Sequence, residues 1–520
     1  MAFYVLGLDS STQSLSSMLL DLDSGTVVDE RTLSFDDDFP QYGTQNGVLP
    51  NRDPTVVHSS PLLWADALDR LFLQMKQAKL PVDNIKAISG SGQQHGSVYL
   101  TSMAEKQFRE MDLHGTLADN VARVLSRPTS PVWMDSSTSA ECEEIRQALG
   151  GKQEAARLTG SDIIERFTGP QIRRFALEEP GAFKQTDHIM LVSSFLSSLI
   201  AGNISPIDVG DGAGMNLMDI ESCTWNAEAL EATAPDLRRR LPPLCASSTV
   251  LGVVNPYLVL KYKLNPSAKA VCWTGDNPSS LVGLGLTQPG RIGISLGTSD
   301  TLFGAMETCQ TQPHAQGHIF GSPAGGYMSL ICFRNGSLAR EAVLHQFGLD
   351  WDGFSKAIQD TPPGNNGKLM LPWFESEMVP LAPAGVHKQG LEDEDASGHC
   401  RAVVEAQMMS MRLHSPYKEN PPNRIHVTGG ASQNEDILQI MANVFQATVV
   451  RQKSTNGAAL GAALRAGQAV RPEKSWEEIS APFMEFPFPD IQPDPEHSQT
   501  YEKLSEAYAA FEKEALESSN

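Results

Sequence analysis

The sequence repeats one short pattern in its two halves, and this duplication limits the folds that the chain can adopt. Residues 6–12 read LGLDSST and residues 294–299 read ISLGTS. Each segment is an apolar strand followed by a tight turn of small hydroxylated residues, whose backbone N–H groups can bind an anion. Two such turns facing each other could hold a polyphosphate from both sides. Taken alone, each turn fits an ordinary strand end as well as it fits a phosphate-binding turn.

The spacing of apolar residues in the first half predicts both strands and helices. Residues 3–8, 17–22 and 26–28 read as strands of an antiparallel meander. Apolar residues at helical spacing predict a helix over residues 61–79, and residues 180–201 read as mainly helical. The first half is therefore expected to contain a sheet flanked by helices.

Three strands of the second half run into turns that contain glycine. They are expected at residues 271–273, 291–296 and 425–427, with helices over residues 434–447 and 500–518. At about 150 residues per domain, 520 residues suggest two to four domains. The order of expected strands and helices changes around residues 250–275. We therefore expect two domains, over residues 1–265 and 266–520.

Charge and cysteine content exclude several functional classes. The chain has 40 basic and 62 acidic side chains, a net charge of −22, and its longest basic run is Arg238 to Arg240. We therefore expect no nucleic acid and no membrane among its partners, because both are anionic. No secretory signal and no apolar run of about 18 residues is present. The seven cysteines form no CxxC pair, which favours reduced thiols in a cytoplasmic protein.

Phosphate binding would have to use groups other than the common motifs. The sequence has no GxxxxGKS or GxxxxGKT loop and no GxGxxG directly after a strand. Asp9, at the end of the first strand, could hold Mg²⁺ through water or could only cap a turn. Thr12 and Gln13 offer donors to phosphate in the same turn, and Thr298 offers them in the other half.

Two polar clusters could bind and activate a hydroxyl group. Asp276 and Asn277 follow a strand in the segment TGDN, where a carboxylate could accept a proton from an alcohol. An Asx-turn explains the same segment. Gln94 and His95 lie in the loop GQQHG after a buried strand, where they could bind a hydroxylated ligand or face solvent. Nothing local assigns a role to Arg166.

Seven segments together resemble one known family. They are LGLDSSTQ, SGSGQQHGS, PVWMDSST, ERFTG, WTGDNPSS, SLGTSDT and VTGGASQN, in this order. The chain resembles the FGGY carbohydrate kinases over residues 3–467, and within them the xylulokinases of animals and plants. The resemblance implies an α/β fold of the actin-like ATPase (ribonuclease H-like) type, with two domains around a central cleft. It also implies transfer of the ATP γ-phosphoryl to the 5-hydroxyl of D-xylulose, with Mg²⁺, in a monomer or homodimer.

The resemblance assigns roles to residues by motif. Asp276 would be the general base, and Asp9 would position Mg²⁺. The sugar would be bound by Gln94, His95, Arg166, Asp276 and Asn277, and the nucleotide by Thr12, Gln13, Gly297, Thr298, Trp351, Gly429, Gly430 and Asn434. One departure is Ser16, which stands where many relatives carry a cation.

Three other functions agree with parts of the sequence. The first is another FGGY kinase acting on ribulose, gluconate, glycerol or fuculose. The second is an actin-like ATPase that works as a conformational switch without a sugar. The third is a sugar sensor without catalysis, which the presence of Asp276 argues against.

Overall fold

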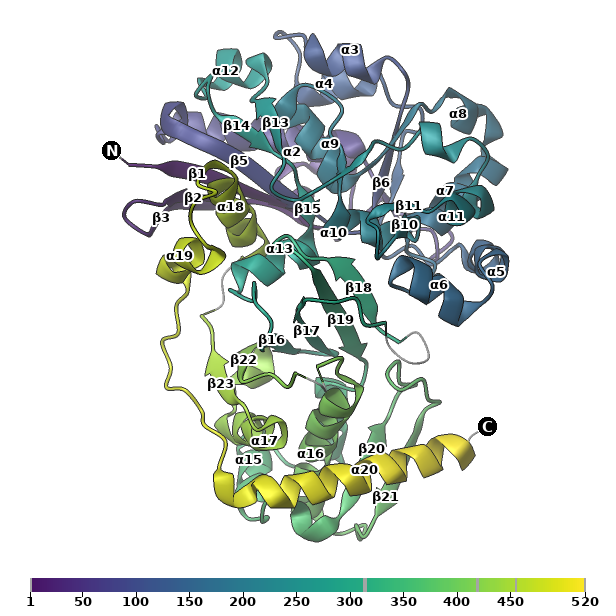
Figure 1. Cartoon of the computed structure of the whole chain (residues 1–520), viewed down its shortest axis with the longest axis vertical. Coiled ribbons are helices and arrows are strands. Elements are labelled where there is room, and N and C mark those ends of the chain that lie inside the picture. Colours follow the sequence, from purple (N-terminus) through teal and green to yellow (C-terminus); the bar gives the residue numbers. More distant parts are fainter. Residues whose placement is uncertain (1, 312–315, 418–419, 454–455, 519–520) are drawn as a thin grey trace.

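Two central sheets, one from each half of the chain, organise the molecule (Figure 1). The computed structural model describes all residues except 1, 312–315, 418–419, 454–455 and 519–520. The first sheet has seven strands: β1 (Tyr4–Ser10), β2 (Ser14–Asp21), β3 (Thr26–Ser34), β5 (Ile85–Gly92), β13 (Val250–Val253), β14 (Lys269–Val271) and β15 (Thr274–Gly275). The second has six: β16 (Arg291–Leu296), β17 (Asp300–Met306), β18 (His318–Gly321), β19 (Tyr327–Phe333), β22 (Arg424–Thr428) and β23 (Thr448–Arg451).

The two sheets repeat the same core arrangement, as the duplicated sequence pattern suggests. In the first sheet, β1 pairs with β2 antiparallel and with β5 parallel. In the second, β16 pairs with β17 antiparallel and with β22 parallel. The strand order is β13-β14-β5-β1-β2-β3 in one sheet, where β15 also pairs with β5, and β18-β19-β17-β16-β22-β23 in the other. The two turns singled out in the sequence therefore follow equivalent central strands.

Helices cover both sheets and join them. The longer ones are α2 (Pro61–Gln77), α5 (Ser139–Ala148), α7 (Thr168–Glu178), α9 (Val192–Ala201), α14 (Ser337–Gln346), α15 (Trp351–Gln359), α16 (Ala396–His414), α17 (Glu435–Phe445), α18 (Gly457–Val470) and α20 (Ser498–Ser518). The last of these, α20, crosses the far end of the second half and buries Tyr501, Leu504 and Tyr508. The expected final helix is confirmed. No described helix is both long enough and apolar enough to cross a membrane.

The segment 180–201 is mainly helical, as expected, but it also contains a short strand that the sequence pattern did not predict. It divides into α8 (Pro180–Gln185), β8 (His188–Leu191) and α9. The short strand β8 pairs antiparallel with β6 (Ser97–Leu100), and its apolar side chains are buried. Pairing with a strand distant in sequence outweighs the local helical preference, which is weak over such a short segment.

Two helices, α18 and α13 (Asp276–Gly283), connect the two halves of the molecule. Although α18 comes late in the chain, it packs on β1 and β5 of the first sheet and on α13 (Figure 1). The strands β14 and β15, which follow the expected boundary at residue 265, also belong to the first sheet. The division into residues 1–265 and 266–520 stays a prediction.

Glycines allow α13, α18 and β1 to approach with backbone against backbone. A Cβ atom on Gly461 would lie 1.8 Å from the carbonyl oxygen of Ser279, and one on Gly283 would lie 1.9 Å from that of Gly457. A Cβ atom on Gly7 of β1 would lie 2.1 Å from the carbonyl oxygen of Ala459. These distances leave no room for a side chain at the three glycines. If any other residue replaced one of them, the packed backbones would have to move apart.

We predict that Gly461→Ala destabilises the protein although alanine favours helices. The added methyl group must displace the backbone of α13, and overpacking of this kind costs about 1–3 kcal/mol in the free energy of unfolding. Gly181→Ala in α8 is the matched control, because no atom lies within 4 Å of its added Cβ. Denaturant unfolding of both variants checks this, and equal stability would contradict the close packing.

Candidate active site

Asp9 lies at the end of β1 in a nearly fully buried position. The hydroxyl of Ser91, on the neighbouring strand β5, donates a hydrogen bond of 2.8 Å to its Oδ1. Burial, together with the negative charge of Asp276, raises the pKa of the Asp9 carboxyl to about 7, and the hydrogen bond from Ser91 opposes this shift. This carboxylate lacks a described cationic partner, which is the condition under which a bound metal ion would stabilise its charged form.

Asp276 is the first residue of α13 and follows β15 directly. Its Oδ1 accepts hydrogen bonds from the backbone N–H of Asn277 at 2.8 Å and from the Asn277 side-chain amide at 3.2 Å. Burial raises the pKa of the Asp276 carboxyl to about 6, and backbone N–H groups of Asn277 and Gln94 oppose this shift. Since its pKa lies near neutrality, the group can take up a proton and release it again.

The loop of residues 93–96 after β5, called here the glutamine loop, contacts Asn277 beside Asp276. The amide of Asn277 donates a 2.8 Å hydrogen bond to Oε1 of Gln94. A Cβ atom on Gly275 would lie 2.4 Å from Cγ of Gln94, so only glycine fits there. Among the described residues, the Nε2 atoms of Gln93 and Gln94 are buried without a partner. Unpaired buried donors of this kind are suited to bind hydroxyl groups of a ligand.

His95 is held in one protonation state and one orientation. Its Nδ1 lies 2.8 Å from the carbonyl oxygen of Gly214, and its ring stacks on Phe167 with centroids 4.2 Å apart. Burial, together with the positive charge of Arg166, lowers the pKa of His95 to about 3. The imidazole is therefore neutral, with its proton on Nδ1, and its Nε2 can accept a hydrogen bond.

Arg166 lies beside His95 with few partners for its guanidinium. Burial lowers its pKa, and within the described part of the chain it forms no ion pair with a carboxylate. Its Nη2 contacts Nε2 of His318 at 3.4 Å. A partly buried guanidinium with most of its five donors unused is suited to hydrogen-bond an oxygen-rich ligand.

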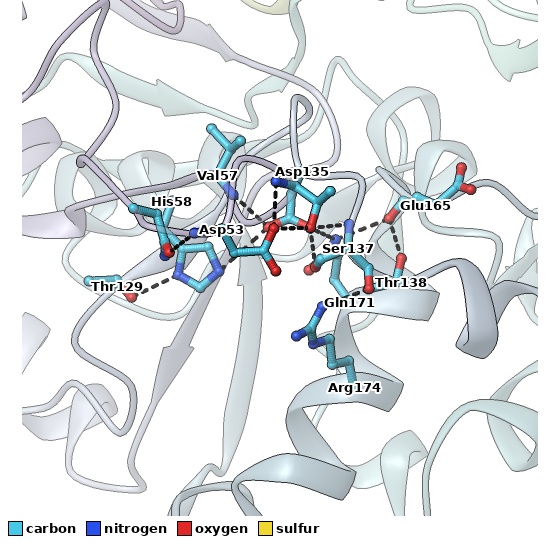
Figure 2. Close-up of polar contacts among 12 residues, drawn as sticks. Asp53, Val57, His58, Thr129, Asp135, Ser137, Thr138, Glu165, Gln171 and Arg174 are labelled. Atoms are coloured by element: carbon cyan, nitrogen blue, oxygen red, sulfur yellow. Dashed lines mark hydrogen bonds and ion pairs between the residues drawn. The ribbon is translucent and has the colours of Figure 1, made fainter.

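A hydrogen-bond network centred on Asp135 and Gln171 reaches the backbone of Glu165 (Figure 2), the residue that precedes Arg166 in the sequence. The buried Asp135 accepts hydrogen bonds from Val57 N and from Nε2 of Gln171, both at 2.8 Å. The Gln171 amide also donates to the carbonyl oxygen of Glu165 at 3.0 Å. The sequence motif PVWMDSST contains Asp135, but its spacing does not reveal this positioning effect.

A cavity of about 680 Å³ lies in the second half, at the ends of its strands and helices. Five of the expected nucleotide-binding residues line it: Gly297, Thr298, Trp351, Gly430 and Asn434. Asn434 caps α17, accepting hydrogen bonds from Asp436 N and Ile437 N. The N-terminus of α17 therefore faces a space large enough for a nucleotide.

A second cavity, of about 440 Å³, is lined by both Asn277 and Gly429. Gly429 has a φ of +90°, and a Cβ atom there would lie 2.3 Å from the carbonyl oxygen of Leu296. One residue expected to bind sugar and one expected to bind nucleotide therefore line the same cavity. Asn277 and Ser280, both in α13, contribute to the wall of this cavity.

Thr12 and Gln13 do not line the 680 Å³ cavity. Thr12 contacts the glutamine loop instead, donating to Oε1 of Gln93 at 3.4 Å and accepting from Nε1 of Trp133 at 2.8 Å. Their role toward the nucleotide stays a prediction. Sequence reasoning missed the Trp133 side chain, which is 41% exposed beside this turn. Its place in PVWMDSST was the available signal.

Ser16, the position without the usual cation, pairs directly with Asp9 across the β1–β2 ladder. Directly paired residues project to the same side of a sheet. The Ser16 hydroxyl is buried and lies 3.0 Å from the hydroxyl of Thr32. The departure from the family pattern is therefore located next to the carboxylate expected to position the metal.

Comparison with known proteins identifies the family. Residues 114–283 match the N-terminal domain of the FGGY family of carbohydrate kinases, and residues 292–470 match its C-terminal domain. The chain is 39% identical to a xylulose kinase of Rattus norvegicus, covering 98% of this chain and 97% of the relative. The chain belongs to the FGGY family of carbohydrate kinases. It is also 40% identical to xylulose kinase 2 of Arabidopsis thaliana, over 89% of this chain and 86% of the relative.

Solved FGGY structures confirm the two-domain actin-like fold. A xylulose kinase from Rhodospirillum rubrum aligns with a TM-score of 0.81 at 21% identity, covering 98% of each chain. A gluconate kinase from Lactobacillus acidophilus aligns with a TM-score of 0.78 at 20% identity, over 99% of this chain and 98% of that chain. Because kinases named for different substrates align almost equally well, this likeness shows the fold alone.

We predict that Trp351→Ala weakens nucleotide binding by this carbohydrate kinase. Trp351 is 44% exposed on the wall of the 680 Å³ cavity, where its ring is available to stack on a base. Base–aromatic stacking contributes about 1–3 kcal/mol, so the KM for ATP should rise about 5-fold to 150-fold. Steady-state kinetics with Trp351→Phe, which keeps a ring, provides the control. A change confined to the sugar KM would place the nucleotide elsewhere.

Proposed function

We propose that this protein transfers the γ-phosphoryl group of ATP to the 5-hydroxyl of D-xylulose, forming D-xylulose 5-phosphate and ADP. The observation that carries the proposal is that Asp276 is hydrogen-bonded to its neighbour Asn277, whose side chain contacts the glutamine loop and lines the cavity shared with Gly429. The choice of sugar is supported by the two relatives named xylulose kinase, each about as long as this chain.

The proposed chemistry needs one base and accurate positioning. The Asp276 carboxylate would accept the proton of the sugar 5-hydroxyl, from a distance of about 3 Å. The hydroxyl oxygen then bonds to the γ-phosphorus as the bond from that phosphorus to the ADP oxygen breaks. Most of the rate enhancement of phosphoryl transfer comes from alignment and charge neutralisation.

Sugar recognition would depend on hydrogen bonds, because the substrate is neutral. Gln94 would offer an amide donor, Asn277 its side-chain carbonyl oxygen and His95 a nitrogen as acceptors, and Arg166 would offer guanidinium donors. A sugar that leaves one of these buried groups unpaired loses about 1–3 kcal/mol of binding free energy. This arrangement supports discrimination between stereoisomers.

Asp9 fits a magnesium ion bound mainly through water. It is a buried carboxylate with a raised pKa. The described residues contain no group of three or more side chains able to hold a metal ion directly. Such a site suits Mg²⁺, which keeps several waters and is otherwise bound by phosphate oxygens. The ion would supply charge neutralisation on the β- and γ-phosphates.

The nucleotide would occupy the 680 Å³ cavity. Trp351 would flank the adenine, Gly430 and Asn434 the adenosine, and Gly297 with Thr298 the phosphates. Thr12 and Gln13 would reach the phosphates from the first half. The cytoplasmic location, and a monomer or homodimer, stay predictions from the sequence.

A panel of sugars tests the proposed function. We expect ADP release from ATP and Mg²⁺ to depend on D-xylulose, with much less turnover on ribulose, gluconate, glycerol or fuculose. Asp276→Ala should fold and lose about 10²–10⁴ in rate, because a positioned general base contributes this much. Faster turnover on another sugar would contradict the substrate. Full D-xylulose activity in Asp276→Ala would contradict the mechanism.

We predict an acid limb near pH 6 in the pH profile of kcat/KM for the sugar. The base works only as a carboxylate, and burial raises the pKa of Asp276 to about 6. The rate should therefore rise about tenfold per pH unit below this value and level off above it. At low Mg²⁺ the Asp9 carboxyl, with its pKa of about 7, should add a second limb that excess Mg²⁺ removes. Rates that stay constant down to pH values well below 6 would contradict the role of Asp276.

A further inference from the structure

The edge strand β18 of the second sheet contacts the first half directly. The backbone N–H of Ile319 donates a 2.8 Å hydrogen bond to the carbonyl oxygen of Gly160. A Cβ atom on Gly160 would lie 2.5 Å from the Ile319 oxygen, so the approach is as close as the backbone allows. The backbone of the adjacent residue, His318, is therefore held at a fixed position against the first half.

His318 bridges two groups of the first half with its two ring nitrogens. Its Nδ1 lies 3.1 Å from the hydroxyl of Ser161, and its Nε2 lies 3.4 Å from Nη2 of Arg166. A guanidinium can only donate, so Nε2 must be the accepting nitrogen. The proton is then on Nδ1 and is donated to Ser161.

The surroundings of His318 keep its ring neutral and fix its plane. Burial and the positive charge of Arg166 hold its pKa well below the usual value, and His95 adds to this effect. The ring packs between two aromatic side chains, with centroids 5.3 Å from Phe167 and 5.8 Å from Phe320. A neutral ring in a fixed plane is a stable acceptor for a charged donor.

The contact with His318 holds the side chain of Arg166, whereas the backbone just before that residue is held by another bond. This backbone is fixed by the Gln171 bond to Glu165 described above (Figure 2). Among the described residues, His318 provides the hydrogen-bond acceptor that contacts the guanidinium. A long, flexible side chain without that acceptor would sample several rotamers.

We propose that His318 is a positioning residue: it orients the guanidinium of Arg166 toward the sugar, so that sugar binding in the first half depends on a side chain of the second half. This inference rests on the proposed function, in which Arg166 binds the sugar. It links sugar affinity to the relative placement of the two halves through one hydrogen bond.

The test compares variants that keep or remove the accepting atom. His318→Phe keeps the ring between Phe167 and Phe320 but cannot accept, and it should raise the KM for D-xylulose about tenfold, as expected for loss of a hydrogen bond to a charged group. Its kcat and its KM for ATP should stay within about twofold of wild type, since the bond lies away from the reacting atoms. His318→Gln keeps an acceptor and should restore most of the sugar affinity.

Tyr327→Phe is the matched control for a lost contact between the halves. Its hydroxyl donates to the carbonyl oxygen of Glu221 at 3.5 Å, from the same sheet, without contacting Arg166. We expect its sugar KM to equal that of wild type. Equal sugar KM values in His318→Phe and wild type would overturn the inference. So would a tenfold increase that His318→Gln does not reduce.

A double-mutant cycle separates positioning from general destabilisation. In an Arg166→Ala background, His318→Phe should have no further effect on the sugar KM, because the group it orients is absent. Independent, multiplying effects would overturn the inference. Failure of the proposed function looks different: the wild-type protein would then show no turnover on D-xylulose, whereas failure of this inference leaves that turnover intact.

Discussion

The contact between α13 and α18 is the constraint on which the site depends. The chain leaves the first sheet at β15, forms α13 and enters the second sheet, and much later α18 returns to pack on β1 and β5. Asp276 is the first residue of α13. The hydroxyl of Ser279, in the same helix, donates a 2.8 Å hydrogen bond to the carbonyl oxygen of Ala458 in α18. The proposed base is therefore held by the same packing that joins the two halves.

Two carboxylates share this confined region in a strongly acidic protein. Asp9 ends a strand of the first sheet and Asp276 starts the helix that leaves it, and the charge of Asp276 contributes to the raised pKa of Asp9. Placing both charges there disfavours the empty, fully ionised site. A cation that binds together with the phosphates relieves the repulsion. The net charge of −22 is thus compatible with an anionic substrate, because local groups outweigh the distant, screened charge.

The sugar side of the site was only partly visible from sequence. Gln94 and His95 stand out because glycines surround them in a loop after a buried strand. Arg166 entered only through the resemblance to a family, because its neighbours are ordinary. His318 gave no signal at all: it contacts Arg166 across 152 positions of sequence, and no local pattern encodes such a contact. The break of residues 180–201 by β8 escaped for the same reason, since its partner β6 lies far upstream.

Local sequence patterns were enough to predict the duplicated strand and turn, the mixed α/β character, the family and the carboxylate that follows the strand before α13. These features are local, because alternating or helical spacing and the small residues of a turn act within about ten positions. The folded structure was needed to show that α18 packs on the first sheet, that the charge of Asp276 raises the pKa of Asp9, and that the second half supplies the acceptor for Arg166. Contacts of this kind are set by packing between distant segments, which a linear pattern does not record.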